Sequence, residues 1–388
     1  MEQKKVRLGI IGIGNMGTGH IKNIMAGKCP EIELAAVADL KPEKENWIRE
    51  NVPFAVPFFP TAEELMNSGL VDAVLVATPH YDHPVLAIQA MKKGLAVLIE
   101  KPAGVYTKQV KEMIAVADET KMPLAIMMNQ RTNCIYRKMR EIVKSGEMGA
   151  IKRTNWIVTD WYRTQAYYDS GDWRATWSGE GGGVLMNQCP HQLDLWQWIC
   201  GMPKKISAQM YFGKWHDIEV EDDVTVFAEY ENGATGTFIT TTGDCPGTNR
   251  FEITLEKGKL IAEGGKLLQW ISEESEPEWT KKCPEGFKKF PLEFREVETD
   301  GKNEQHPGVL NAFAAHILRG EPLVADGREG INGLSISNAC HLSAWTGKTV
   351  ELPLCDEEYF EELMKRVQTS RRKTAQVTES PADLTGTY

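Results

Sequence analysis

The first third of the chain alternates between short apolar runs and longer segments in which apolar residues recur every three or four positions. The runs predict buried parallel strands, and the segments between them predict amphipathic helices. We expect strands at 6–11, 33–38, 72–77, 95–99 and 124–128, and helices through Ile21, Ile24 and Met25 and at 84–93 and 107–120. Strands that alternate with such helices indicate a doubly wound parallel sheet, which binds ligands beyond the carboxyl ends of its strands.

From about Ile151 onward, apolar residues recur at every second position instead. This pattern predicts strands at 155–159, 206–212, 224–230, 235–241, 251–256 and 267–271. Asn232-Gly233 is a strong hairpin signal between two of them. Helices are expected at 307–319 and 330–346. The second half should therefore be α+β, with a mostly antiparallel open sheet that leaves one face to solvent or to an interface.

The first apolar run ends in Gly12-Ile13-Gly14-Asn15-Met16-Gly17, which gives the order strand, G-x-G-x-x-G, helix. The first glycine permits a tight turn, the second lets the backbone approach a pyrophosphate, and the third lets helix and strand pack closely. The helix start adds N–H donors and a positive dipole end. Asp39 follows the second strand. A carboxylate at this position accepts hydrogen bonds from the ribose hydroxyls and repels a 2′-phosphate. The pattern predicts a site that prefers NAD to NADP; a turn or cap role for Asp39 is the alternative.

The overall composition sets the domain count and excludes some partners. A chain of 388 residues is too long for one ordinary core, so two domains are expected. The predicted fold class is α/β, with a Rossmann domain at 1–128, an α+β substrate-binding and oligomerisation domain at 129–365, and a polar tail at 366–388. A net charge of -10 argues against a nucleic-acid partner. We see no cleaved leader and no membrane-spanning run, so a cytoplasmic location is expected.

Four further segments form a specific set by their order and spacing. The resemblance that they carry runs from about Val6 to about Leu354. They are Thr78-Pro79-His80-Tyr81-Asp82-His83, Glu100-Lys101-Pro102, Ser145-Gly146-Glu147-Met148-Gly149, and the stretch from Gly181 to Asp194 that contains Asn187 and His191. The set resembles the Gfo/Idh/MocA family, the glucose–fructose oxidoreductase and inositol dehydrogenase group. The resemblance implies NAD(P)-dependent oxidation or reduction of sugars, inositols or nucleotide-linked sugars, without a metal. It also implies homodimers or homotetramers that form through the open sheet.

The resemblance also implies which residues carry the chemistry. Lys101 and His191 would be catalytic, and Asn187 stands where inositol dehydrogenases often have Asp. His80 replaces the usual Asn of its turn. The remaining cofactor contacts are expected, beside the glycine motif and Asp39, from Thr78, Pro79, His80, His83, Glu100, Lys101, Trp173 and Arg174.

Hydride transfer at a carbinol carbon also needs a group that takes the hydroxyl proton. Burial near a positive nicotinamide ring should lower the pKa of Lys101 and let it accept that proton or stabilise an alkoxide. We expect Asn187 and His191 on one helix face, one turn apart. His191 would accept a proton or hold the substrate, and Asn187 would bind a neighbouring hydroxyl. Because an amide raises a histidine's basicity less than a carboxylate does, the proton role shifts toward Lys101.

The segment from Trp156 to Trp177 is rich in aromatic residues, which either bind sugar faces or fill the core. Tyr162 and His306 are further substrate-binding candidates, although His306 could instead cap the following helix. The Asn-x-x-x-His spacing is similar to that of family members that oxidise C3 of a pyranoside, so we expect this reaction. Two alternatives remain: an NAD-assisted glycosidase acting by oxidation and elimination, and a non-catalytic ligand-sensing protein on the same fold.

Overall fold

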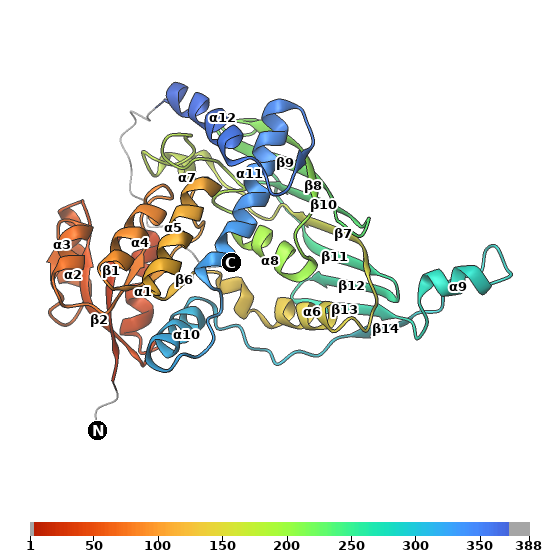
Figure 1. Ribbon diagram of the computed structural model, residues 1–388, viewed down its shortest axis with the longest axis horizontal. Helices are drawn as coiled ribbons and strands as arrows, with labels where there is room; N and C mark the ends of the chain where they lie inside the picture. The colour runs from red at the N-terminus through yellow and green to blue at the C-terminus, as the bar shows by residue number, and fades with distance from the viewer. Residues whose placement is uncertain (1–3, 372–388) are drawn as a thin grey trace.

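The computed structural model describes residues 4–371 and contains two sheets with helices packed against them (Figure 1). The first sheet has the strand order β3-β2-β1-β4-β5-β6, and all neighbouring strands run parallel. Its strands are β1 (Val6–Ile11), β2 (Ile32–Ala38), β3 (Phe58–Phe59), β4 (Ala73–Val76), β5 (Ala96–Ile99) and β6 (Leu124–Ile126). The strand order reverses between β1 and β4, and sheets of this topology bind ligands at such a switch point.

Five helices connect these strands and cover the sheet. They are α1 (Asn15–Met25), α2 (Glu43–Asn51), α3 (Ala62–Asn67), α4 (Asp82–Lys92) and α5 (Thr107–Thr120). The strands are almost wholly buried, as the continuous apolar runs predict. Gly12, Asp39, Thr78 and Lys101 follow β1, β2, β4 and β5 within two residues of the strand ends. The predicted placement of these four residues along one edge of the sheet is therefore confirmed.

The second sheet has nine strands in the order β14-β13-β12-β11-β7-β10-β9-β8-β15. β7 and β10 run parallel, and the other neighbouring pairs run antiparallel. The strands are β7 (Ile151–Val158), β8 (Lys205–Phe212), β9 (Glu221–Glu229), β10 (Thr235–Thr241), β11 (Asn249–Leu255), β12 (Gly258–Glu263), β13 (Lys266–Ile271), β14 (Glu293–Glu296) and β15 (Val350–Glu351). β12 was not predicted, because its buried residues Leu260, Ile261 and Ala262 are consecutive rather than alternating. The hairpin predicted at Asn232-Gly233 joins β9 to β10.

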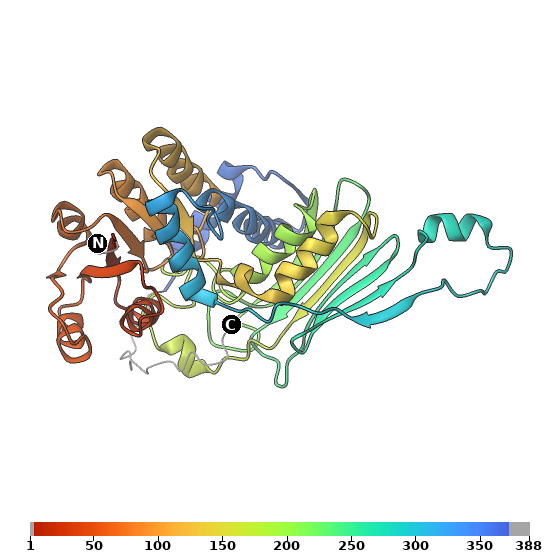
Figure 2. The ribbon, with the colours of Figure 1, turned by 90° about the horizontal axis from the view of Figure 1, so that it is seen from below.

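Helices cover one face of the second sheet, and Figure 2 shows α6 (Cys134–Ser145) and α8 (Pro190–Cys200) above it. On this face the ring of Trp156 stacks on Phe251 at 4.1 Å, and Trp196 of α8 stacks on Phe238 at 5.5 Å. The opposite face carries Ile157 and Phe227, which are 37% and 44% exposed. No helix of residues 4–371 covers that face (Figure 2). The expected two-sided sheet, with a packed face and an open one, is confirmed.

The remaining elements of the second half are short or peripheral. The connection between β13 and β14, which contains α9 (Glu276–Lys282), projects beyond the sheet (Figure 1). η1 (Asn129–Thr132), α7 (Gln165–Asp169) and η2 (Gly327–Glu329) are single turns or short helices. α11 (Gly330–Thr346) lies against β8, and α12 (Asp356–Thr369) continues past residue 366, where the polar tail was expected to begin. Within the part that the structure describes, no helix has the length and hydrophobicity to span a membrane.

One late helix, α10 (Gln305–Arg319), packs on the first sheet rather than the second. Its apolar residues form one buried cluster with side chains of β1, β4 and β5. From α10 the cluster takes Val309, Leu310, Phe313 and Ala314. The core of the first sheet is therefore completed by residues that lie far beyond it in the sequence.

This packing can be tested by removing the largest α10 side chain. Phe313→Ala should lower the free energy of unfolding by about 3–5 kcal/mol, because it opens a cavity between α10 and the sheet. Phe287→Ala is the matched control: Phe287 is fully exposed, so the same change should cost less than about 0.5 kcal/mol. Denaturant unfolding measures both values, and equal losses for the two variants would contradict the packing of α10.

Candidate functional site

The glycine motif after β1 has the geometry of a dinucleotide loop. Gly12 has φ 95°, and a Cβ there would lie 2.5 Å from the carbonyl oxygen of Ala77. A Cβ on Gly17 would lie 1.9 Å from the Gly12 carbonyl oxygen. A Cβ on Gly14 would meet no protein atom within 4 Å, and α1 starts at Asn15 without a side-chain cap. The loop is thus tight where helix and strand meet and open where a pyrophosphate would approach, so the residues fit a dinucleotide.

Asp39 lies directly against this loop. Its Oδ2 accepts a hydrogen bond from the Ile13 backbone N–H at 2.6 Å, and its Oδ1 accepts one from the Lys41 N–H at 2.9 Å. The carboxylate therefore has the turn role that we considered as the alternative. It also joins the β2 end to the glycine loop, which is where an acid that binds ribose hydroxyls must stand.

The turn after β4 is tied to the loop after β5 by His83. The two ring nitrogens of His83 lie 2.8 Å from the carbonyl oxygens of Pro102 and Thr78. Burial lowers the pKa of His83, and the two carbonyls oppose that shift. The Thr78 hydroxyl beside it is buried and has no hydrogen-bond partner among the described residues, so it is available to a ligand. The cofactor contacts of Thr78, Pro79 and His83 stay predictions.

His80, which replaces the usual Asn, contacts the second half of the chain. Its Nδ1 lies 3.0 Å from the Glu180 carbonyl oxygen, and its ring packs edge-on against Trp173 at 5.6 Å. Burial lowers the pKa of His80 well below its ordinary value, and the charges of His83 and Lys101 act in the same direction. A neutral His80 therefore links the turn after β4 to the loop that contains Glu180.

Glu100 is buried and its carboxylate is occupied by protein donors. Its Oε1 lies 2.6 Å from Nε2 of His20, and its Oε2 accepts a hydrogen bond from the Lys101 backbone N–H at 3.2 Å. Burial raises the pKa of Glu100, but the hydrogen bond and charge of His20 outweigh it and bring the pKa to about 2. Glu100 is thus an anion next to Lys101 in the chain, and its predicted contact with the cofactor stays a prediction.

His306 lies beside this pair rather than capping its helix from outside. It is in the first turn of α10, and its ring centroid is 5.4 Å from that of His20. Burial lowers the pKa of His306 to about 4, and Glu100 opposes this shift while His20 and Lys101 add to it. Sequence reasoning missed His20, because its partner Glu100 is 80 residues away and no local pattern connects them.

Lys101 brings the two halves of the chain together. Its Nζ donates a hydrogen bond to the backbone carbonyl of Asn187 at 2.8 Å. Burial lowers the pKa of Lys101, with Arg174 adding to the shift and Glu100 and Glu180 opposing it. The predicted direction of the pKa shift therefore holds, and the alternative of a solvated surface lysine does not.

The prediction that Asn187 and His191 share one helix face is wrong. α8 begins at Pro190, so Asn187 lies in the turn before the helix. Proline favours the first helical turn and disfavours helical geometry in the residue before it, which is why the helix cannot extend back to Asn187. The sequence contained this signal in Pro190.

His191 is buried at the start of α8. Its Nδ1 has no hydrogen-bond partner among residues 4–371, so the alternative of a structural histidine bonded to a carbonyl is not seen at this atom. Burial lowers the pKa of His191 well below its ordinary value, and Lys101 and His306 add to the shift. His191 is therefore neutral near pH 7 and within electrostatic reach of the lysine.

The loop that carries Asn187 is held by a buried glutamate. Glu221 of β9 accepts hydrogen bonds from the Gly183 and Leu185 backbone N–H groups at 2.8 and 3.0 Å. Its Oε2 also lies 3.0 Å from Nε2 of His341 on α11. A Cβ on Gly183 would lie 2.0 Å from the Glu221 carbonyl oxygen, so the glycine permits this close approach. Sequence reasoning missed Glu221 and His341, whose contacts with this loop are long-range.

Trp173 and Arg174 pack with Tyr167 beside that loop. The Arg174 guanidinium lies 4.7 Å from the ring centroid of Trp173 and 4.8 Å from that of Tyr167, and Nη1 donates to the Tyr167 hydroxyl at 3.0 Å. Glu180, which sequence reasoning also missed, accepts a hydrogen bond from the Asn187 side-chain amide. Arg174 and Glu180 both act on the pKa of Lys101, so this group belongs to the same site.

Two other residues of the motif region are set apart from this group. Tyr162 is 48% exposed and makes no hydrogen bond, ion pair or ring contact with Lys101, Asn187 or His191 among the described residues. Its substrate role stays a prediction. Asp194 forms a bidentate ion pair with the buried Arg131 at 2.7 Å, which joins α8 to η1. The Asp194 carboxylate therefore belongs to the contact between α8 and η1 rather than to the site around Lys101.

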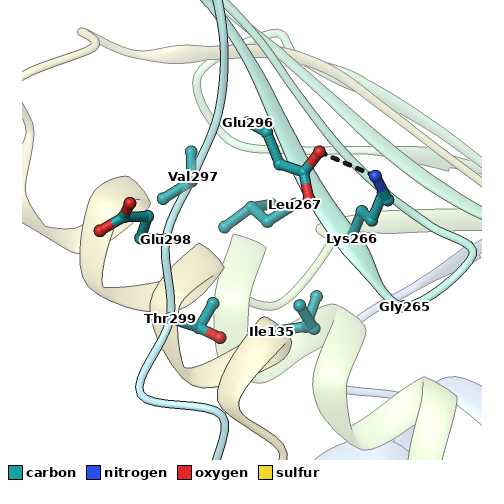
Figure 3. Close-up of a pocket in the computed structure, with 8 residues that line it drawn as sticks. All are labelled: Ile135, Gly265, Lys266, Leu267, Glu296, Val297, Glu298 and Thr299. Carbon is teal, nitrogen blue, oxygen red and sulfur yellow. Dashed lines mark hydrogen bonds and ion pairs between the residues drawn. The ribbon is translucent and has the colours of Figure 1, made fainter.

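A surface pocket of about 440 Å³ lies elsewhere, between α6, the β12–β13 turn and the segment after β14 (Figure 3). It contains none of the residues around Lys101. Its rim carries the ion pair between Lys266 and Glu296 at 2.9 Å. Within residues 4–371, no group of three or more His, Cys, Asp or Glu side chains is placed to hold a metal ion.

Two family models match the chain in its two halves. Residues 6–128 match an oxidoreductase family with an NAD-binding Rossmann fold, and residues 136–261 match the GFO/IDH/MocA C-terminal domain. Together the matches cover more than half of the chain and agree with the predicted fold class and cofactor.

Known proteins with similar sequences and structures include three that span different parts of the chain. The rhizopine catabolism protein MocA of Rhizobium meliloti is 28% identical over 51% of this chain, which spans 58% of that protein. The myo-inositol 2-dehydrogenase of Thermotoga maritima is 23% identical over 89% of this chain and 98% of its own length. The WlbA dehydrogenase of Bordetella pertussis, solved with NADH and UDP-GlcNAcA, is 26% identical with a TM-score of 0.77, covering 92% of this chain and all of that one.

Removal of the Asp39 carboxylate tests the ribose contact. Asp39→Ala should weaken NAD binding roughly tenfold or more, because a charge-assisted hydrogen bond is lost. NADP binding should weaken less, because the repulsion of its 2′-phosphate is also removed. Isothermal titration calorimetry with both dinucleotides measures the two constants. The loss of the Ile13 contact affects both ligands, so equal weakening would mean that Asp39 acts only on the loop.

Proposed function

The chain belongs to the Gfo/Idh/MocA family of oxidoreductases with an NAD-binding Rossmann fold, and on this basis we propose that it is an NAD-dependent dehydrogenase of a secondary hydroxyl. The substrate would be a sugar, glycoside or polyol. Within this class, we propose a pyranoside that reacts at C3. The observation that carries the proposal is the contact of the Lys101 amine with the Asn187 carbonyl at 2.8 Å. It brings a proton-accepting group from the first sheet to the loop that leads to His191.

The residues that would hold NAD surround the carboxyl edge of the first sheet. The open backbone at Gly14 and the N-terminus of α1 would take the pyrophosphate, and Asp39 would take the adenosine ribose. Thr78, with its unpaired buried hydroxyl, would contact the cofactor further along the same edge of the sheet. Bound NAD supplies the hydride acceptor or, when reduced, the hydride donor.

The protein groups at this edge are suited to moving the hydroxyl proton. Burial lowers the pKa of Lys101, so its ammonium releases a proton more readily than that of an exposed lysine, and the neutral amine that results is available to accept the hydroxyl proton. The anionic Glu100 limits that shift and keeps a compensating charge in the buried site. His191, neutral and with Nδ1 unpaired, can hydrogen-bond to the same substrate or accept its proton. We assign substrate contacts to Lys101, Asn187, His191, Tyr162 and His306.

The substrate class is supported by the similar proteins. One is an inositol dehydrogenase, and another was solved with a nucleotide-linked sugar acid; both ligands carry several hydroxyls. The comparisons favour neither a glycosidase nor a non-catalytic sensor. A cytoplasmic location, where NAD is available, is part of the proposal.

The open face of the second sheet would form the interface of a homodimer or homotetramer. Ile157 and Phe227 are exposed on this face although they belong to central strands. Large apolar side chains on an otherwise uncovered sheet mark an association surface. A second copy would cover the same face by two-fold symmetry.

Replacement of the lysine tests the enzyme directly. Lys101→Ala should reduce turnover roughly 10²–10⁴-fold, because the proton acceptor is lost, and should leave NAD affinity largely unchanged. Lys92→Ala, which removes an exposed lysine of α4, is the matched control and should retain turnover. NADH absorbance and product mass are followed together with NAD and a panel of polyols and glycosides. A K101A variant with turnover near that of the wild type would exclude this role, and glycoside cleavage without NADH accumulation would indicate the glycosidase.

A charge on the open face tests the interface. Phe227→Glu should shift the protein toward a smaller species, because association through this face would bury an unpaired carboxylate from each copy. Phe54→Glu introduces the same charge at an exposed position of the first half and should not change the assembly. Size-exclusion chromatography with light scattering gives the mass of each variant. An F227E protein with the same mass as the wild type would place the interface elsewhere.

A further inference from the structure

We propose that Glu180 is a positioning residue that fixes the side-chain amide of Asn187, so that Asn187 presents a hydrogen-bond acceptor to the substrate. The substrate would then carry a free hydroxyl donor next to the reacting carbon. This inference rests on the proposed function for its substrate, and on the geometry of two side chains for its mechanism.

The carboxylate of Glu180 is surrounded by donors. The residue is 2% exposed, and its Oε2 accepts a hydrogen bond from the Ala175 backbone N–H at 2.6 Å. Its Oε1 accepts one from the Asn187 Nδ2, and Arg174 Nη1 lies 3.9 Å from the same oxygen. Burial raises the pKa of Glu180, whereas Arg174 and the two hydrogen bonds oppose that shift. An ionised carboxylate can only accept hydrogen bonds, and each of these partners is a donor, so the contacts suit the anion.

This contact decides how the Asn187 amide is turned. An amide has a donor side and an acceptor side, and only the donor side can face a carboxylate. The Nδ2 of Asn187 is therefore committed to Glu180, and its Oδ1 has no partner among the described protein groups. Asn187 is also only partly buried, and its backbone carbonyl already receives the Lys101 amine. The acceptor Oδ1 thus stands on the residue that the proton-accepting lysine touches.

The recognition that follows is specific. A hydroxyl next to the reacting carbon can donate to Oδ1, whereas a deoxy or O-methyl substituent at that position cannot. Sites that require a hydrogen bond reject analogues that lack it, because a buried polar group is then left unpaired. The geometry therefore points to a vicinal diol as the part of the substrate that the site recognises.

The same reasoning explains why an aspartate would not fit in place of Asn187. Its side chain would set a second carboxylate against Glu180, and two carboxylates at this separation share one proton, so the pKa of the pair rises. Other groups also act on this locus. Arg174 and Lys101 favour the anion of Glu180, whereas Glu221 opposes it, and Tyr168 and His80 lie close to the same loop. None of these groups removes the conflict between two acceptors.

Exchanging the carboxylate and the amide between positions 180 and 187 tests the pairing, and this test needs no substrate. In N187D two acceptors face each other. In the double variant E180Q/N187D, the introduced glutamine can accept from the Ala175 N–H with its oxygen and donate to the introduced aspartate with its amide. N187D should lower the melting temperature by roughly 5 °C at pH 8, and by less at pH 5, where the shared proton is more readily held. The double variant should recover most of this loss and lose the pH dependence of the difference.

The single variant E180Q adds a kinetic readout. The introduced glutamine should turn its amide toward position 187, so that Asn187 flips and presents Nδ2 to the substrate. The substrate for this test is the polyol or glycoside that the wild type turns over fastest. With E180Q we expect its KM to rise roughly tenfold and kcat to change much less. The double variant restores an acceptor at position 187, so KM should return toward the wild-type value.

Each outcome decides one part of the proposal. If the double variant shows the summed losses of its two single variants at both pH values, the residues are not coupled and the pairing is excluded. If the melting temperatures are coupled but E180Q leaves KM unchanged, Glu180 does not position Asn187 for the substrate. If no compound is turned over even by the wild type, the proposed function fails, while the thermal cycle still decides the pairing.

Discussion

The candidate site depends on one physical requirement, which is that buried carboxylates must be met by donors. A carboxylate removed from water is costly unless hydrogen bonds and opposite charges replace its hydration. Glu221 is fully buried, and it meets this requirement with two backbone N–H groups of the glycine loop and with His341. These bonds fix the loop on the second sheet. Two residues beyond Leu185, the same loop delivers the carbonyl of Asn187 to the amine of Lys101.

Glu100 and Glu180, which both act on the pKa of Lys101, repeat this arrangement. Glu100 is satisfied by His20 and by the Lys101 N–H, and Glu180 by Ala175 and Asn187. Both anions oppose the effect of burial on the pKa of Lys101, whereas Arg174 reinforces it. Burial therefore favours the neutral amine of Lys101, which can accept a proton, and the two carboxylates favour its cation. Such tuning is typical of groups that must exchange protons near neutral pH.

Local patterns were sufficient to predict the frame of the molecule and the position of its first-half residues. The glycine motif, Asp39, Thr78 and Lys101 were predictable because parallel strands carry their carboxyl ends to one edge, so position in the chain becomes position in space. The family resemblance supplied Asn187 and His191, but the helix that was thought to carry both begins at Pro190. His20, Glu180, Glu221 and His341 could not be predicted, because each acts through a partner distant in sequence or in another element. Tyr162 lies exposed, and its substrate contact stays a prediction.

The packing of α10 has a consequence for how the two halves can be separated. Val309, Leu310 and Phe313 close the apolar layer over Leu8 and Ile10, although the family boundary between the halves lies near residue 128. A fragment cut at that boundary would expose this layer to water. Any chimera that exchanges nucleotide-binding halves between relatives must therefore carry the 305–319 helix with them. The polypeptide crosses between the halves three times, after β6, before α10 and after α10, so a single cut near residue 128 does not separate them.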